Sequence, residues 1–218
     1  MAIPKIKHYE PPLGVPLSRA SLPWTVDPDR AALLIHDMQN YFLDRYESER
    51  FVSRLVGNIS QVRRSCHAQG IPTFYTAQPG NQPRSQRGLL VDFWGQGIPD
   101  DEHALAIVQG LEPVPGKDEV LVKHRYSAFA KSIFLRRLQE LGRTQLIVCG
   151  VYAHIGCLVT ATETFMADIQ PFVVADALGD FSLVHHLMAL EHMGHCSSKV
   201  VSTAEVLSQL APRLEMQA

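Results

Sequence analysis

The chain has 218 residues, of which 46% are hydrophobic and 19% are charged, and its formal net charge is −2 at pH 7. This length and composition allow a substantial core and favour one globular domain. The near-neutral charge offers no basic field for nucleic acid. The N-terminal MAIPKIKHYEPPLG lacks the apolar stretch of a signal peptide, and no run approaches the ~20 apolar residues that span a bilayer. We therefore expect a soluble cytoplasmic protein with no nucleic-acid or membrane partner.

Residues 1–28 are rich in proline and show little periodicity, so we expect them to form an arm that lies over the domain or over a neighbouring subunit. The domain is expected over 29–212, followed by a tail over 213–218. Six short apolar runs predict strands over 31–36, 72–76, 119–122, 145–149, 171–174 and 199–202. Apolar residues spaced three and four apart predict helices over 51–69, 132–141, 158–168 and 183–195. Strands alternating with helices predict an α/β fold, with a mostly parallel central sheet flanked by helices on both faces.

Polar residues follow four of the predicted strands. In a sheet of this kind ligands bind outside the carboxyl ends of the strands, so these residues are the first candidates for a site. They are His36 and Asp37 after the first run, Gln78 after the second, Lys123 after the third, and 152–156 after the fourth. A long segment over 79–101 contains Arg87 and Trp94, and we expect it to close over the site as a lid.

Each charged candidate also has a structural interpretation. Asp37 ends a buried strand, where a carboxylate must be paired or shifted in pKa, but it could equally cap the helix that follows. Lys123 either meets an acid or reaches solvent along its aliphatic stem. Arg87 and Arg125 could each hold a substrate carboxylate through a bidentate contact, or could form surface ion pairs.

The four cysteines lack the spacing of a zinc site or a disulfide scaffold, so we expect reduced thiols. Cys157 invites a different interpretation, because it enters a predicted helix after a strand, where a thiolate would be stabilised. His192 and Cys196 have the spacing of a metal pair, but no third ligand is evident, and we predict no metal site.

Six stretches together are similar to one family. They occur in its order: LLIHDMQNYF (33–42), YTAQPG (75–80), RGLLVDFWGQG (87–97), LVKHRYSAF (121–129), QLIVCGVYAHIGC (145–157) and PFVVADALGDFS (171–182). They resemble the isochorismatase (isochorismate pyruvate-hydrolase) subgroup of the isochorismatase-like hydrolases. The resemblance implies a Rossmann-like α/β domain, usually dimeric, that cleaves the enol ether of isochorismate to 2,3-dihydro-2,3-dihydroxybenzoate and pyruvate for catecholate siderophores.

The motifs also imply roles for individual residues. Asp37 matches the acid of the family and Lys123 matches its partner, with no metal or cofactor. The implied substrate-binding residues are Gln78, Arg87, Trp94, Tyr126, Tyr152 and Gly156, and the peptide between Val151 and Tyr152 is implied to be cis. One departure is His124, which stands where the subgroup usually has tryptophan. Because neighbours alternate along a strand, we expect His124 to point away from the side of Lys123.

Enol-ether hydrolysis needs a positioned proton donor rather than a thiol, and we predict Asp37 as that general acid. The resemblance places a cysteine nucleophile of related amidases at the position of Gly156, so we expect Cys157, one residue later, to point elsewhere. Three alternatives stay open at this point. They are hydrolysis of 2-amino-2-deoxyisochorismate as in phenazine biosynthesis, amidase chemistry through Cys157, and a docking module for synthetases of siderophore assembly. We expect no aryl carrier domain, because the sequence ends shortly after 210 and shows no carrier attachment motif.

Overall fold

The computed structural model describes residues 3–12 and 22–211. Its centre is a six-stranded sheet with the order β3-β2-β1-β4-β5-β6, and every neighbouring pair is parallel. The strands are β1 (Ala31–His36), β2 (Thr73–Ala77), β3 (Asp118–Val122), β4 (Gln145–Val151), β5 (Gln170–Gly179) and β6 (Lys199–Val201). The predicted fold class is therefore confirmed. The predicted tail over 213–218 and part of the predicted arm lie outside the described residues.

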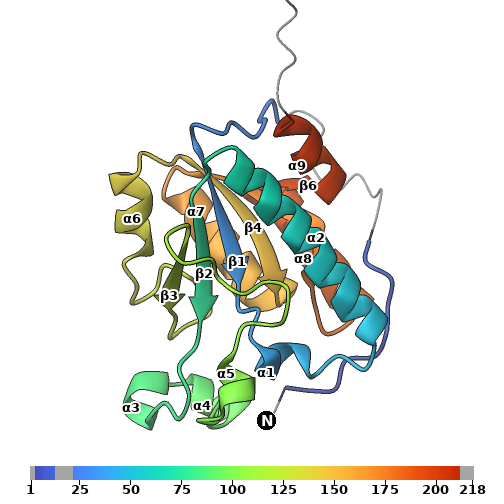
Figure 1. Cartoon of the computed structure of the whole chain (residues 1–218). Coiled ribbons are helices and arrows are strands. Elements are labelled where there is room, and N and C mark those ends of the chain that lie inside the picture. Colours follow the sequence, from blue (N-terminus) through green and yellow to red (C-terminus); the bar gives the residue numbers. More distant parts are fainter. Residues whose placement is uncertain (1–2, 13–21, 212–218) are drawn as a thin grey trace, which may run out of the picture.

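Helices cover both faces of this sheet (Figure 1). One layer contains α2 (Glu49–Ala68) and α9 (Thr203–Gln209); the other contains α6 (Phe134–Glu140), α7 (Leu158–Met166) and α8 (Leu183–Cys196). The alternation of side chains along a strand divides the core between the layers, because Leu33 and Ile35 of β1 face the first while Ala32 and Leu34 face the second. Both faces of the sheet are thus buried, as parallel strands require.

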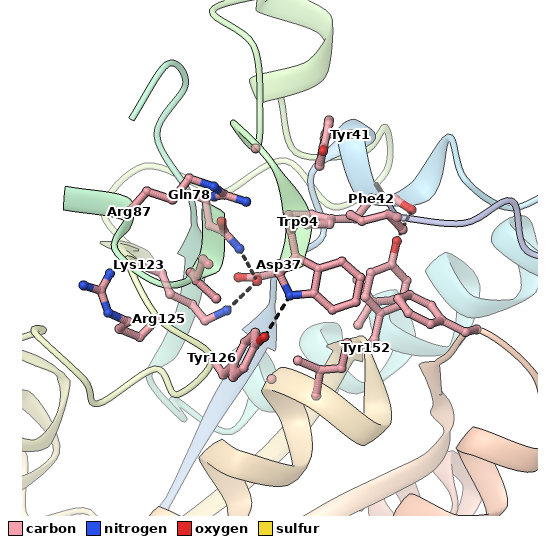
Figure 2. A pocket seen from close by; sticks show the side chains of 17 residues that line it. Asp37, Tyr41, Phe42, Gln78, Arg87, Trp94, Lys123, Arg125, Tyr126 and Tyr152 are labelled. Carbon is pink, nitrogen blue, oxygen red and sulfur yellow. Dashed lines mark hydrogen bonds and ion pairs between the residues drawn. The ribbon is translucent and has the colours of Figure 1, made fainter. Parts of the chain in front are cut away.

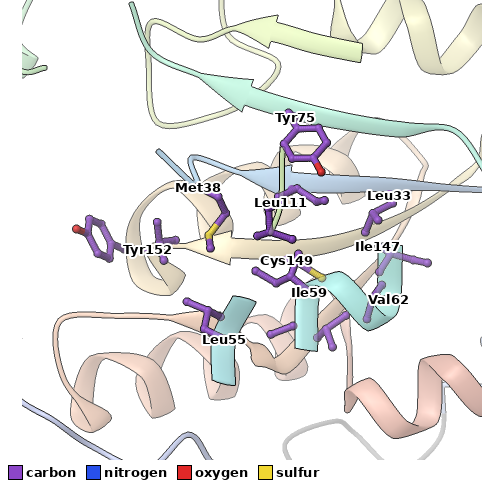
Figure 3. Packing of buried hydrophobic residues seen from close by; sticks show 14 of the residues in the cluster. Leu33, Met38, Leu55, Ile59, Val62, Tyr75, Leu111, Ile147, Cys149 and Tyr152 are labelled. Carbon is purple, nitrogen blue, oxygen red and sulfur yellow. The ribbon is translucent and has the colours of Figure 1, made fainter. Parts of the chain in front are cut away.

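The apolar stripe of α2 shows how the sequence builds the first layer. Buried residues recur three and four positions apart: Phe51, Leu55, Ile59, Val62 and Cys66. The Ser48 side chain caps the helix by accepting a hydrogen bond from the Phe51 backbone N–H. Figure 3 shows Leu55, Ile59 and Val62 beside residues of β1 and β4.

Four short helices gather beyond the carboxyl ends of the strands (Figure 1). They are α1 (Asn40–Leu43), α3 (Arg84–Arg87), α4 (Leu90–Trp94) and α5 (Glu102–Leu105). The last three belong to the connection between β2 and β3, so most of the predicted lid segment lies at this end of the sheet. A π-helical turn, η1 (Ala153–Cys157), joins β4 to α7. None of the helices in the described ranges combines the length and the apolar composition of a membrane span.

The predicted arm is described over residues 3–12 and 22–28, and residues 3–12 lie over their own domain. Ile6 is fully buried and forms a parallel bridge with Tyr46, and Tyr9 packs on Phe51 of α2. The N-terminal segment therefore packs against the core of its own domain.

Candidate active site

The strand order brings the two predicted catalytic residues together. Asp37 follows β1, Gln78 follows the neighbouring β2, and Lys123 follows β3, which pairs with β2. The Lys123 backbone N–H donates to Ala77 O at 2.9 Å, so the β3 register continues to the lysine itself. As a result Lys123 Nζ lies 2.5 Å from Asp37 Oδ2, with both side chains almost completely buried (Figure 2).

Asp37 is held by three donors. Lys123 Nζ and Gln78 Nε2 donate to Oδ2, the latter at 3.1 Å, and Thr76 Oγ1 donates to Oδ1 at 2.6 Å. Burial by itself would raise the pKa of Asp37, but the charge of Lys123 and the donated hydrogen bonds outweigh it and hold the pKa below its ordinary value. Asp37 is therefore a carboxylate in the unliganded site at neutral pH.

Two residues that the sequence analysis did not single out fix this arrangement. Thr76 at the end of β2 is fully buried, and its hydroxyl also accepts the Asp37 backbone N–H at 3.0 Å. Gln39 accepts the Gln78 backbone N–H at 2.7 Å and donates to Gln78 O at 3.0 Å. The sequence signal that could have identified Thr76 was a polar residue near the end of a core strand, β2, which neighbours β1.

Asp37 and Lys123 open into a pocket whose empty space, including the open solvent at its mouth, is about 550 Å³. All eight predicted site residues line it: Asp37, Gln78, Arg87, Trp94, Lys123, Tyr126, Tyr152 and Gly156. Its further lining residues are mostly apolar and include Ile3, Phe42, Leu90, Ile155 and Phe181. A concave apolar site with a few convergent polar groups is typical of a small-molecule site.

The pocket has an excess of positive charge. Its lining contains three cationic side chains, Lys123, Arg87 and Arg125, against the single carboxylate of Asp37. Arg87 is only 4% exposed; its Nε donates to Gly95 O at 2.6 Å, while Nη1 is buried without a hydrogen-bond partner. Burial lowers the pKa of Arg87. A buried guanidinium with an unsatisfied donor is suited to bind an anionic group of a ligand.

The residues after Lys123 contact the lid segment one after another. His124 Nδ1 lies 3.2 Å from Gln82 Oε1, Arg125 Nη1 donates to Gln86 O at 2.7 Å, and Trp94 Nε1 donates to Tyr126 Oη at 2.8 Å. His124 is absent from the pocket lining, so its side chain points away as expected. The replacement of the usual tryptophan therefore changes a contact with the lid segment rather than the pocket wall.

The far side of the pocket is built by the residues after β4. The peptide between Val151 and Tyr152 is cis, as the resemblance implied. Tyr152 Oη donates to Phe42 O at 2.8 Å, and its ring packs against Phe181. Burial raises the pKa of Tyr152 well above its ordinary value, so this phenol stays neutral.

Gly156 is required by packing as well as by space in the pocket. A Cβ at this position would overlap the imidazole of His36, which is fully buried beneath it. His36 Nδ1 donates to Val151 O at 2.8 Å, and burial together with the charge of Lys123 lowers its pKa to about 4. The space that a side chain at position 156 would need is therefore filled by the neutral imidazole of His36.

Cys157 does not belong to the pocket. It is fully buried in the second core layer, and burial raises its pKa well above the ordinary value. A helix N-terminus does not stabilise the thiolate here, because desolvation dominates. Within residues 3–12 and 22–211, no group of three or more His, Cys, Asp or Glu side chains could hold a metal ion.

Solved structures define the class of fold. A crystal structure of a cysteine hydrolase from Pseudomonas syringae pv. phaseolicola 1448A matches with a TM-score of 0.78, covering 91% of this chain and 98% of the other. At 20% identity this likeness shows the fold alone. An isochorismatase family protein from Burkholderia thailandensis shares this fold with a TM-score of 0.74 and 24% identity, over 85% of this chain and 97% of the other.

Sequence comparison defines the family. The model of the isochorismatase domain matches residues 31–205. "Enterobactin synthase component B" of Escherichia coli is 46% identical, with 97% of this chain and 74% of that protein covered. "Isochorismatase" of Bacillus subtilis is 46% identical (96% and 67%), as is "Phenazine biosynthesis protein PhzD" of Pseudomonas fluorescens (94% and 98%). The chain belongs to the isochorismatase family and is a hydrolase.

Proposed function

We propose that this enzyme hydrolyses the enol ether of isochorismate to 2,3-dihydro-2,3-dihydroxybenzoate and pyruvate, in a pathway to a catecholate siderophore. The observation that carries the proposal is the buried aspartate Asp37 in a pocket whose lining contains no thiol. Besides Lys123, the partner of Asp37, that lining contains two cations, Arg87 and Arg125. Isochorismate carries two carboxylates, so the charge of the pocket complements it.

In the proposed reaction, protonated Asp37 donates its proton to the methylene carbon of the enolpyruvyl group. The carbon bearing the ether oxygen becomes an oxocarbenium ion, and Asp37 becomes a carboxylate. Water adds to that carbon and returns a proton to Asp37. The hemiketal then collapses: its bond to the ring oxygen breaks as the C=O bond of pyruvate forms, and the proton lost by the hemiketal hydroxyl passes to the ring oxygen, which leaves as the alcohol. No covalent enzyme intermediate forms.

Asp37 must gain a proton before this reaction, although it is ionised in the unliganded site. We assign this change to the bound substrate. Its carboxylates compete with Asp37 for the charge of Lys123 and add negative charge nearby, and both effects raise the pKa of Asp37. Lys123 thus orients Asp37 and pairs with the enolpyruvyl carboxylate. Gln78 fixes the Asp37 oxygen that faces Lys123, and Arg87 holds a carboxylate.

The closest rival is hydrolysis of 2-amino-2-deoxyisochorismate, supported by the relative named for phenazine biosynthesis. The same proton donor serves both substrates, which differ at one ring carbon. Incubating the enzyme with each compound and following pyruvate release separates them. We expect the larger kcat/KM with isochorismate. A larger value with the amino compound would assign the rival function, and no pyruvate from either would overturn enol-ether hydrolysis.

We further propose that the enzyme is a cytoplasmic homodimer and docks with a synthetase of siderophore assembly. Family resemblance supports the dimer, and the relative named as a component of enterobactin synthase supports the docking. Light scattering coupled to gel filtration tests the dimer. A monomer at micromolar concentration would contradict it.

A further inference from the structure

The N-terminal segment, residues 3–12, reaches the pocket from the opposite end of the sequence. Its buried residues recur every third position, Ile3, Ile6 and Tyr9, whereas the residues between them, such as Lys5 and Lys7, are exposed. A period of three is typical of an extended strap that turns one edge toward the protein. Ile3, at its start, lines the pocket that contains Asp37.

Ile6 anchors the strap to the loop after α1. Its backbone N–H donates to Arg45 O at 2.8 Å, and its carbonyl accepts the Glu47 N–H at 2.9 Å. Its side chain is fully buried, but it is not part of the pocket lining. Ile6 therefore holds the strap in place without facing the pocket.

Tyr9 anchors the strap to the loop after β5. Its hydroxyl accepts the Asp180 backbone N–H at 2.8 Å. Asp180 in turn accepts hydrogen bonds from the backbone N–H of His154, at 2.7 Å, and of Phe181, also at 2.7 Å. Phe181 lines the pocket, and His154 lies in η1 between Tyr152 and Gly156, which both line it.

We propose that residues 3–12 form part of the substrate site. Ile3 supplies a wall that contacts the carbon skeleton of the substrate, and Tyr9 positions the strap against the loops that carry Phe181 and Tyr152. Ile3 is thus a substrate-binding residue, and Tyr9 is a positioning residue. The inference rests on the proposed function for the identity of the substrate, but not for the placement of the wall.

The test compares Ile3→Ala with two matched controls in the full chain. Ile6→Val shortens a buried strap residue outside the pocket lining, and Lys5→Ala changes an exposed one. We expect Ile3→Ala to raise the KM for isochorismate about tenfold while kcat changes less than twofold, because small losses of apolar contact in a pocket weaken binding by this order. Ile3→Leu should have a KM close to that of the unmodified enzyme, and both controls should leave the KM unchanged. Tyr9→Phe raises KM with kcat retained.

A second readout does not require turnover. Calorimetry measures the Kd of 2,3-dihydroxybenzoate, the aromatic relative of the proposed product, for the same variants. We expect Ile3→Ala to weaken this binding about tenfold and the controls to leave it unchanged. If the unmodified enzyme released no pyruvate, the proposed function would fail while the Kd comparison still tested the wall. Unchanged KM and Kd in Ile3→Ala, or equal losses in Ile6→Val, would overturn the inference.

Discussion

The buried pair of Asp37 and Lys123 makes a quantitative prediction for stability and for activity. Lys123 Nζ lies 2.5 Å from Asp37 Oδ2, and the two side chains are 3% and 6% exposed. Removing one partner of such a pair leaves an uncompensated buried charge, which costs about 3–5 kcal/mol. We therefore expect Asp37→Asn and Lys123→Met each to lower the free energy of unfolding by about this amount. A domain with ~5–15 kcal/mol of stability can lose this amount and still fold at 25 °C.

The double variant separates charge from packing. With both charges removed, no buried ion is left without a partner, so Asp37→Asn/Lys123→Met should be less destabilised than the sum of the single variants, with a coupling of about 2 kcal/mol or more. Urea unfolding at pH 7.5 measures all four proteins. Additive losses would refute the argument that the two charges stabilise each other in the folded protein.

Activity should not follow stability in this series. Because Asp37 is the proposed proton donor, Asp37→Asn should lower kcat at least ~1,000-fold, within the ~10²–10⁴ range of general acid catalysis. The double variant should be equally inactive, although its loss of stability is smaller than the sum of the two single losses. Pyruvate release measures both. More than a tenth of the normal kcat in Asp37→Asn would refute proton donation by Asp37.

Four further expectations follow from the site and the core. Because Asp37 is ionised in the free enzyme, log(kcat/KM) should fall by about one for each pH unit above pH 5; a flat profile would exclude proton donation from this state. Arg87→Gln should raise KM about 10- to 100-fold, and Arg84→Gln, an exposed control three residues earlier, should not. Cys157→Ala should keep kcat within about twofold and cost about 1 kcal/mol of stability, whereas loss of activity would favour amidase chemistry. Burial lowers the pKa of His186 to about 4, so the unfolded chain takes up a proton below pH 6.5 that the folded protein does not. Lowering the pH from 7.5 to 5 should therefore cost about 2 kcal/mol at this residue, and urea unfolding of His186→Gln should show a correspondingly flatter pH dependence.

The fold followed from local patterns wherever a segment was long and periodic. The predicted first strand has the bounds of β1, and the predicted helix over 51–69 corresponds to α2. The prediction ended the fifth strand at 174, but β5 continues to Gly179 and includes a polar residue, Asp176. That carboxylate accepts hydrogen bonds from Asn58 of α2 and from Thr203 at the start of α9. These partners are distant in sequence, so a local pattern cannot reveal why an aspartate is tolerated there. The seven-residue α9 was missed because it is too short to show a period.

The candidate site likewise contains residues that the sequence could predict and residues that it could not. Residues that end strands could be found, since the carboxyl ends of parallel strands meet at one edge and the strand order then places Asp37 beside Lys123. The residues that pack around them could not be found in this way. Gly156 suggested open space in the pocket, whereas the structure shows in addition that the imidazole of His36 lies where its Cβ would be. Ile3 gave no signal, because its place in the pocket depends on a strap held by contacts with residues more than 30 positions away.

The protonation of Asp37 connects these elements to the proposed chemistry. A carboxylate that is buried but left without a cation would be neutral in the free enzyme and could protonate any bound molecule. Lys123 prevents this by holding Asp37 ionised. In the proposed mechanism this lasts until another anion takes a share of the charge of Lys123. Arg87, which lines the same pocket and has an unsatisfied donor, is proposed to bind such an anion, and the neutral ring of His36 adds no second cation beside Asp37. Under the proposed function, the substrate's own carboxylates raise the pKa of Asp37 so that it becomes protonated and can act as an acid. When the pocket holds only water, Asp37 stays ionised.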